Sequence, residues 1–272
     1  MLKHLEQEGI IKFSDQHLCV DGKERASVQL RKLQTLWFNT GTLCNLACTD
    51  CYIESSPKND RLEYLSFEEI YKYLIELIEG NYDTQEIGFT GGEPFLNPEI
   101  IEMLNKSLEL KFRVLVLTNA MKPMIKHAVQ LKKLKEKYGA ELMLRVSLDH
   151  YTSVLHESER GLNSWKPAIN GLKWLSENNF LITVAGRSKW NECEKDTRSG
   201  YNRLFKELEV KIDAWDLGQL VLFPEMDNVS NVPEITTACW EILQVEPSSM
   251  MCASSRMIIK KKGKMFPNVQ AC

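Results

Sequence analysis

The sequence predicts an α/β protein built as a partial (βα)6 barrel of the TIM type around a parallel sheet. Two observations favour this fold class. Short apolar or β-branched segments recur along the chain, and each is separated from the next by a stretch that suits a helix. Polar residues follow several of these segments directly, at the strand ends where barrel proteins build their active sites. The alternation implies right-handed crossovers between parallel strands.

Six segments are expected to be the strands, because each is short and rich in apolar or β-branched residues. In chain order they are residues 36–39, 86–90, 112–118, 142–148, 181–185 and 219–223. The helix after the first strand has the clearest signals: Ser66 and Glu69 match a capping box, and Gly80 ends the pattern. Asn97-Pro98 suits the start of a second helix, and Ser164 suits the cap of a third.

The overall composition is that of a globular protein. Of the 272 residues, 43% are hydrophobic and 26% charged, and 34 basic against 37 acidic residues give a net charge of −3. This balance excludes a large basic domain, so nucleic acid is not expected as a partner. The sequence has no apolar run of membrane-spanning length, and its first residues lack the apolar segment of a signal peptide. A cytoplasmic protein without membrane contact is therefore expected.

The predicted strands divide the chain into a core and two extensions. Residues 36–225 contain all six predicted strands and are expected to form the core domain. Residues 1–35 precede it as an N-terminal extension, and residues 226–272 follow it as a C-terminal extension that contains cysteines. The lysine-rich run near Gly263 in this last segment is interpreted as a solvated surface.

Three cysteines are clustered directly after the first predicted strand. Cys44, Cys48 and Cys51 form the pattern Cys-x3-Cys-x2-Cys, and in a reducing compartment such a cluster indicates metal binding or catalysis rather than disulfides. Iron–sulfur clusters and zinc are the usual occupants of such sites. A cubane cluster held by three cysteines leaves one iron open, which suits catalysis. A zinc site with a fourth ligand elsewhere and three structural thiols are the alternatives.

Further motifs follow the next strands, and with the cysteines they resemble the radical S-adenosylmethionine (radical SAM) superfamily. Tyr52 follows the last cysteine, where that family has an aromatic residue, and Thr90–Pro94 resembles its Gly-Gly-Glu-Pro segment after the second strand. The other strand ends are polar: Thr118–Asn119 closes the third strand, Ser147–Asp149 the fourth and Gly186–Arg187 the fifth. The resemblance covers about residues 36–225, with the motifs in the family's order.

The resemblance implies a [4Fe–4S] cluster on Cys44, Cys48 and Cys51, whose open iron binds S-adenosylmethionine. One electron, from a donor of the flavodoxin or ferredoxin type, then cleaves the sulfonium and yields a 5′-deoxyadenosyl radical. This radical abstracts hydrogen from an unidentified substrate. The implied cofactor contacts are Gly91, Gly92 and Glu93 for the methionine amine, Tyr52 and Phe223 for the adenine, Ser147 and Asp149 for the ribose, and Thr118, Asn119 and Arg187 for the carboxylate.

One segment is similar to radical SAM proteins with a C-terminal cluster-binding extension of the SPASM or twitch type, among them peptide-modifying maturases and sulfatase activators. The similarity lies in residues 147–161. It makes Cys239, Cys252 and Cys272 candidates for a second iron–sulfur cluster, although the usual Gly-x4-Cys is absent. A chain that stops at Cys272 is expected to be truncated within that region. The alternative is that Cys239 is a small buried apolar residue, and Cys19 and Cys193 are expected to be structural.

The prediction is therefore a radical SAM enzyme of undetermined reaction, with peptide or protein modification as one candidate. Two alternatives come from other classes: an iron–sulfur electron-transfer protein and a zinc-stabilised α/β binding module. The first does not account for the motif Gly91–Pro94. The second predicts a colourless protein, whereas iron–sulfur proteins are brown.

Overall fold

The computed structural model describes residues 12–224 and 231–271. Within these ranges one eight-stranded sheet has the strand order β6-β5-β4-β3-β2-β1-β7-β8. The strands are β1 (Thr35–Asn39), β2 (Glu86–Thr90), β3 (Arg113–Thr118), β4 (Leu142–Ser147), β5 (Leu181–Ser188), β6 (Leu220–Pro224), β7 (Ser255–Ile259) and β8 (Asn268–Ala271). Neighbouring strands from β6 through β7 are parallel, and the β7–β8 pair is antiparallel. The predicted α/β fold with a parallel sheet is confirmed.

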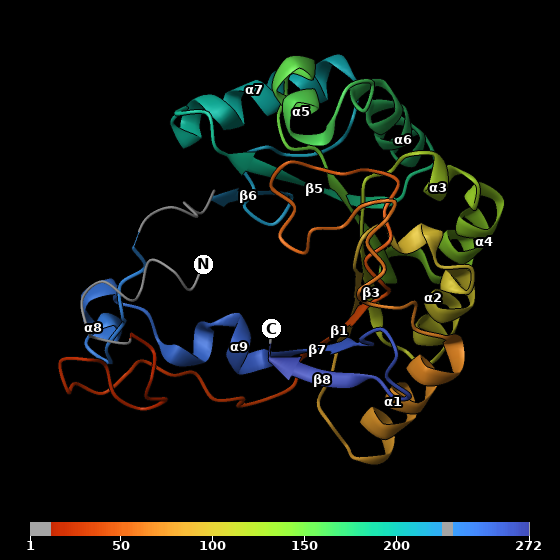
Figure 1. The fold of residues 1–272 in the computed structure, drawn as a ribbon. Helices are drawn as coiled ribbons and strands as arrows, with labels where there is room; N and C mark the ends of the chain where they lie inside the picture. The colour runs from red at the N-terminus through yellow and green to blue at the C-terminus, as the bar shows by residue number, and fades with distance from the viewer. Residues whose placement is uncertain (1–11, 225–230, 272) are drawn as a thin grey trace.

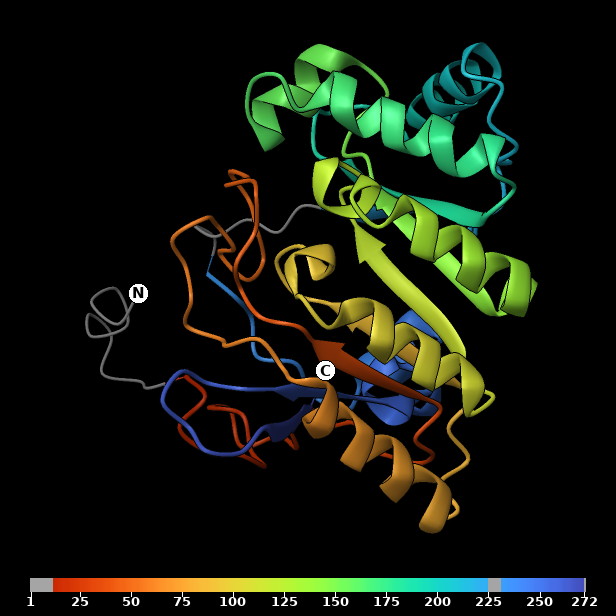
Figure 2. The same ribbon diagram turned by 90° about the vertical axis from the view of Figure 1, so that its right-hand side faces the viewer.

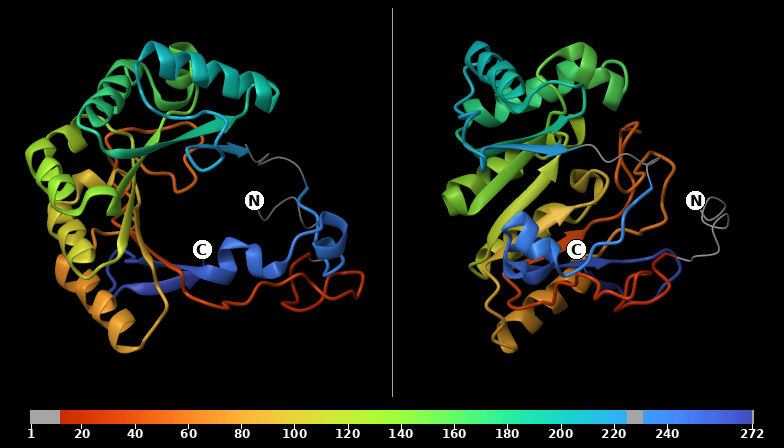
Figure 3. Two further views of the ribbon diagram at one scale, coloured as in Figure 1. Left: turned by 180° about the vertical axis from the view of Figure 1, so that it is seen from behind. Right: turned by 90° about the vertical axis from the view of Figure 1, so that its left-hand side faces the viewer.

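The sheet curves into an open arc, α1–α7 lie along the outer side of that arc, and α8 and α9 lie at its open end (Figure 1). The α-helices are α1 (Phe67–Glu79), α2 (Ile100–Glu109), α3 (Lys122–Ile125), α4 (Ala128–Tyr138), α5 (Ser153–Arg160), α6 (Trp165–Glu177), α7 (Glu194–Glu207), α8 (Cys239–Leu243) and α9 (Met251–Ser254). Short 3-10 helices are η1 (Pro94–Leu96), η2 (Gly139–Glu141) and η3 (Pro247–Ser249). Figure 2 shows α1, α2 and α4 in successive rows over the outer face, and Figure 3 shows the arc from behind. No described helix is both long and apolar enough to cross a membrane.

The six core strands lie where the sequence predicts them, within one residue at each end except for β5. β5 runs on to Ser188 because its pairing with β6 continues to the partners Ser188 and Pro224. The main hydrophobic core fills the space between the sheet and the helices, where Phe38 and Phe89 are fully buried with ring centroids 5.7 Å apart. Apolar burial of this kind supplies most of the free energy of folding. It also fixes the strand ends that carry polar residues.

Helix starts follow the predictions only in part. The capping box of Ser66 and Glu69 opens α1 as expected. In contrast, α2 begins after Glu99 rather than at Asn97-Pro98. The buried Asn97 side chain holds the preceding turn, because it accepts a hydrogen bond from Glu99 N (2.9 Å) and donates one to Leu65 O (2.8 Å). Ser164 is the N-cap residue of α6, but its hydroxyl makes no capping hydrogen bond.

The two extensions add to the core in a way that the sequence did not predict. β7 pairs in parallel with β1, so the C-terminal extension lengthens the sheet by two strands. The N-terminal extension runs beside the C-terminal one: Arg25 forms a 2.6 Å ion pair with Glu234, and Ala26 N donates to Ile235 O at 2.8 Å. The segments coloured red and blue therefore lie together at one end of the arc (Figure 1).

Candidate functional site

The ends of β2–β6 and the loop after β1 enclose a cavity of about 290 Å³. Nearly all residues that the sequence singled out line this cavity. They are Cys44, Cys48, Cys51, Tyr52, Gly91, Gly92, Thr118, Asn119, Ser147, Asp149, Arg187 and Phe223. Of the residues predicted to hold the first cluster and S-adenosylmethionine, Glu93 is the one that does not line it, and the C-terminal Cys239 and Cys252 do not line it either. The topology explains the convergence, because the carboxyl ends of neighbouring parallel strands lie at the same edge of a sheet.

The cysteine loop places its sulfur atoms in a largely buried setting. Cys44 is 8% exposed, and its Sγ accepts a hydrogen bond from Leu46 N at 3.4 Å. Cys51 Sγ accepts from Ser55 N at 3.2 Å. Burial raises the pKa of the Cys44 thiol to about 12 and also raises the pKa of Cys48. Thiolates here therefore depend on the positive charge of a bound metal.

The three cysteines fit an iron–sulfur cluster better than a single ion. In the part of the chain that the structure describes, no three His, Cys, Asp or Glu side chains converge on one metal ion. A tetrahedral zinc ion would need its sulfur ligands at about 2.3 Å from one point. A [4Fe–4S] cluster instead binds each cysteine to a different iron, so its ligands are spread around the cluster. Cys44, Cys48 and Cys51 all line one cavity, as the separate ligands of such a cluster would.

The paired glycines hold the loop after β2 against the cysteine loop. Gly92 N donates to Gly41 O at 2.8 Å, and Glu93 N donates to Leu43 O at 3.1 Å. A Cβ on Gly92 would lie 2.2 Å from Leu43 O, and Gly91 has a φ of +133°, which disfavours other residues. The sequence predicted that these glycines allow a close approach to a ligand. Within the protein, their closest approach is to the backbone of the loop after β1, and because both also line the cavity the approach of a ligand stays a prediction.

Replacement of Gly92 by Ala is therefore expected to displace the cysteine loop and lower the iron content after anaerobic reconstitution. Inserting a methyl group into packed backbone costs about 1–3 kcal/mol, and here the neighbour is the carbonyl of Leu43. Gly218→Ala is the matched control, because its added Cβ would meet only the end of the Asp216 side chain at 3.2 Å. Iron and sulfide assays check the result. Equal iron in both variants would contradict this role of Gly92.

Glu93 is buried behind the cavity wall, at 1% exposure. Its carboxylate accepts hydrogen bonds from Phe95 N (3.2 Å), Thr118 Oγ1 (2.8 Å) and Asn119 N (2.9 Å). Burial raises the pKa of Glu93 to about 7, against the opposing effect of these donors. The family resemblance implied a contact with the methionine amine. In the structure this carboxylate faces the end of β3, where it holds Thr118 and Asn119 in the cavity wall, and the contact with the methionine amine stays a prediction.

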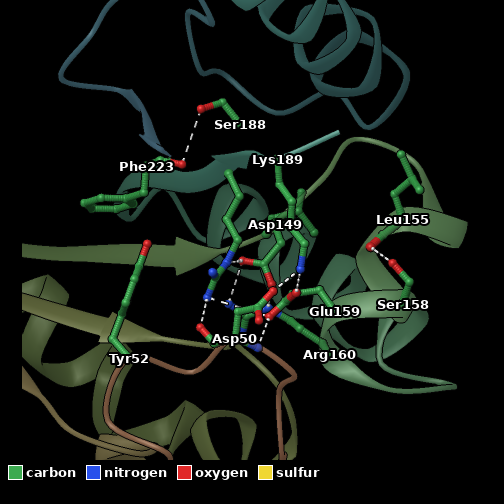
Figure 4. A network of polar contacts seen from close by, with 12 residues as sticks. Asp50, Tyr52, Asp149, Leu155, Ser158, Glu159, Arg160, Ser188, Lys189 and Phe223 are labelled. Carbon is green, nitrogen blue, oxygen red and sulfur yellow. Dashed lines mark hydrogen bonds and ion pairs between the residues drawn. The ribbon is translucent and has the colours of Figure 1, made fainter. Parts of the chain in front are cut away.

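Asp149, which lines the cavity, is contacted by two arginines, of which Figure 4 labels Arg160. Arg160 holds it with two hydrogen bonds of 2.6 and 3.0 Å, and Arg187 Nε lies 3.4 Å from Asp149 Oδ1. Burial alone would raise the pKa of Asp149, but the charge and hydrogen bonds of Arg160, with Arg187, hold it below its ordinary value. The carboxylate implied for the ribose therefore serves first as the counter-ion of these arginines.

A second group of charges ties the cysteine loop to the end of β5 (Figure 4). Lys189 contacts the Asp50 carboxylate and lies 2.8 Å from Glu159 Oε2. Asp50 N donates to Glu159 Oε1 at 2.8 Å, and Arg187 donates to Asp50 O at 2.9 Å. Thr49 N adds a hydrogen bond to Glu159 O at 2.8 Å. These contacts fix the segment between the second and third cysteines.

Sequence reasoning missed several of these residues. Asp50, Glu159, Arg160 and Lys189 were not singled out, although Asp50 lies inside the cysteine motif. Asp50 is a charged residue between two predicted metal ligands, and a charge in such a place needs a partner. This is the one signal in the sequence that could have drawn attention to Asp50. The partners themselves lie 109 and 139 residues further along the chain, so their identity was not available from local sequence. Arg145, which also lines the cavity, was missed as well.

Two aromatic rings stand at the mouth of the cavity. Tyr52 is 55% exposed and Phe223 is 40% exposed, and both line it. Arg187 Cζ lies 5.0 Å from the centre of the Tyr52 ring, and the Tyr52 hydroxyl donates to Pro224 O at 3.5 Å. Flat rings held in this way suit a stacked heterocycle.

The C-terminal cysteines do not form a ligand set within the described residues. Cys239 and Cys252 are both partly exposed, and no third cysteine or histidine, aspartate or glutamate joins them at a metal site there. Cys272, the third predicted ligand, lies outside the described residues. Cys239 is not the fully buried apolar residue of the alternative interpretation. Cys19 is buried and Cys193 is exposed.

Comparison with known proteins agrees with the family that the sequence motifs resemble. The family model described as "Radical SAM superfamily" matches residues 38–196. The subtilosin biosynthesis protein AlbA of Bacillus subtilis is 35% identical over 143 residues, which is 52% of this chain and 30% of AlbA. A probable GTP 3′,8-cyclase of Saccharolobus islandicus is 26% identical over 211 residues, 75% of this chain and 65% of the cyclase. The chain thus spans less than two thirds of either relative.

Solved structures agree with the fold. Streptococcus suis SuiB bound to S-adenosylmethionine superimposes with a TM-score of 0.59 and 13% identity, covering 84% of this chain and 58% of SuiB. Methylornithine synthase (PylB) gives a TM-score of 0.52 and 15% identity, covering 89% of this chain and 76% of PylB. At such identities the likeness is one of fold. Because the family model spans more than half of the sequence and includes the whole cysteine loop, the chain belongs to the radical SAM superfamily, whose members use a [4Fe–4S] cluster and S-adenosylmethionine.

Proposed function

We propose that this chain cleaves S-adenosylmethionine reductively and uses the resulting radical to abstract hydrogen from a peptide substrate. The observation that carries the proposal is the single cavity in which three cysteines face the paired glycines and the polar ends of β3–β5. An electron-transfer protein has no need for such a cavity beside its cluster. A radical enzyme needs one, because its reactive species must be held away from water.

The cysteines would bind three irons, which leaves the fourth iron open to the amine and carboxylate of S-adenosylmethionine. When bound, these cofactors supply the chemistry: an electron from an external donor of the flavodoxin or ferredoxin type cleaves S-adenosylmethionine to methionine and a 5′-deoxyadenosyl radical. The chain's own residues bind and orient them. Backbone carbonyl groups at Gly91 and Gly92 are suited to accept from the ammonium group. Arg160 also lines the cavity, and the part of its guanidinium that does not contact Asp149, Nη1, suits the carboxylate.

The nucleoside half would lie toward the ends of β4–β6. Ser147 is suited to a ribose hydroxyl, and we assign this role to it rather than to Asp149, because Arg160 and Arg187 already engage that carboxylate. Tyr52 and Phe223 would flank the adenine at the cavity mouth.

A peptide is proposed as the substrate class on the basis of the curated relative. AlbA is a bacteriocin biosynthesis protein, and its similarity extends over half of this chain. SuiB has been solved with its precursor peptide. The likeness between that structure and this chain supports a shared fold only, because the identity is 14% and the TM-score is 0.58. The type of bond made on the peptide stays open.

The test uses protein reconstituted anaerobically with iron and sulfide, reduced with dithionite and supplied with S-adenosylmethionine. Mass spectrometry is expected to find 5′-deoxyadenosine and methionine in equal amounts. Deuterium from a labelled peptide encoded beside the gene should then appear in the 5′-deoxyadenosine. A brown protein that forms neither product would favour the electron-transfer alternative, and a colourless zinc protein would favour the binding module.

A further inference from the structure

Arg145 lies on the inner face of β4, inside the cavity. Side chains along β4 alternate: Leu142, Leu144 and Val146 are buried against the helices, while Arg145 and Ser147 are only partly buried and line the cavity. Pairing places Arg145 level with Leu117 of β3 and Thr183 of β5. The guanidinium is therefore presented to the cavity by the middle of the sheet rather than by a loop.

Among the described residues, no carboxylate forms an ion pair with Arg145. Arg160 and Arg187, the other arginines of the cavity, both contact Asp149. Among the described residues, Arg145 makes one side-chain hydrogen bond, from Nε to Thr183 Oγ1 at 3.0 Å, and has no carboxylate within 4.0 Å. Burial lowers the pKa of Arg145, while the charge of the more distant Glu86 raises it.

An arginine in this position stays charged, because its guanidinium does not lose its proton in proteins. A partly desolvated cation without a counter-ion is unfavourable, so the cavity is expected to attract an anionic oxygen group. The Thr183 hydroxyl fixes Nε and leaves the Nη groups to form a two-pronged contact. The ligand chemistry that matches a planar fork is a carboxylate.

The depth of Arg145 separates it from the rim where the cofactor contacts are proposed. It precedes Ser147 by two residues, which is about 7 Å along a strand. The glycine pair, Asn119 and the cysteine loop all lie at or beyond the strand ends. A group held by Arg145 would thus lie below the rim, deeper in the cavity than the proposed cofactor contacts.

We propose that Arg145 binds a carboxylate of the substrate and so favours substrates that carry an acidic group. The assignment of the anion to a peptide's acidic side chain rests on the proposed function. The anion subsite itself does not rest on the proposed function. It is inferred from the position of Arg145 in the cavity and from the lack of a carboxylate beside it among the described residues.

The experiment measures chemical modification of Arg145 by methylglyoxal in the reconstituted protein loaded with S-adenosylmethionine, with peptide mass spectrometry as readout. Acetate at high concentration is expected to slow modification of Arg145 about threefold, as a charge-assisted contact should, whereas neutral acetamide does not. Exposed Arg113 on β3 is the internal control and should react equally in all samples. Inorganic phosphate serves as a second anion.

Each outcome decides the proposal. Protection of Arg145 by acetate, without protection by acetamide or phosphate, supports the proposal. Equal reactivity with acetate and acetamide, or stronger protection by phosphate than by acetate, would overturn the carboxylate assignment. If S-adenosylmethionine by itself already shields Arg145 completely, the residue belongs to the cofactor site and the proposal fails. Because no turnover is required, these results are independent of whether 5′-deoxyadenosine is formed.

Discussion

Alanine at Cys44, Cys48 or Cys51 is expected to abolish 5′-deoxyadenosine formation. Each cysteine supplies one of only three thiolates at the cavity, so the loss of one leaves two ligands for a cluster that normally needs three or four from the protein. Burial raises the pKa of Cys44, which means that its thiolate exists only with a metal bound. A site with two remaining ligands cannot offset that cost.

The measurement combines iron and sulfide assays with product analysis after anaerobic reconstitution. Wild-type protein should bind about four irons in this site and each variant far fewer. Cys193→Ala is the matched control, because Cys193 is exposed, precedes α7 and does not line the cavity. Product formation at the wild-type rate by any of the three variants would refute the cluster assignment.

Asp149→Asn is expected to lower the free energy of unfolding by about 3–5 kcal/mol, the usual cost of breaking a buried ion pair by removing one partner. The Asp149 side chain is 4% exposed, and its loss removes the carboxylate that Arg160 and Arg187 both contact. Because Arg160 lines the cavity, binding of S-adenosylmethionine is expected to weaken as well. This double effect distinguishes Asp149 from a purely structural acid.

The matched control is Asp60→Asn, which breaks the ion pair with Lys262 at the surface. Asp60 is 55% exposed and Lys262 is 61% exposed, so this change should lower the stability far less than Asp149→Asn does. Urea unfolding of the two variants and the wild type checks the difference. Similar losses for both variants would contradict the importance of the buried network.

The pH dependence of this contribution follows from the direction of the pKa shift. The pKa of Asp149 is held below its ordinary value of 3.8, chiefly by Arg160, which overcomes the effect of burial. The stabilisation is therefore fully present above that value and is lost as the pH falls through the lower pKa of the folded state. The gap between wild type and Asp149→Asn should be constant at neutral pH and narrow only in acid.

Local sequence was sufficient for the fold of the core and for the location of the site. Each core strand is a short apolar segment whose own composition specifies it, so β1–β6 were predictable one at a time. The polar residues at their ends gather in one cavity because parallel strands present their carboxyl ends at the same edge. The family assignment from the cysteine and glycine motifs is confirmed by the match over residues 38–196.

The tertiary structure decided which side chains and backbone groups contact one another. The sequence alone determined that Gly92, Glu93 and Asp149 lie at strand ends, but a motif does not specify the direction of a side chain or its partner. Gly92 packs on the cysteine loop and Glu93 faces the end of β3. Asp149 is bound by Arg160, and β7 joins the sheet beside β1 from the far end of the sequence. These contacts depend on the packing of distant segments, where burial forces each charge and each backbone group to find a partner.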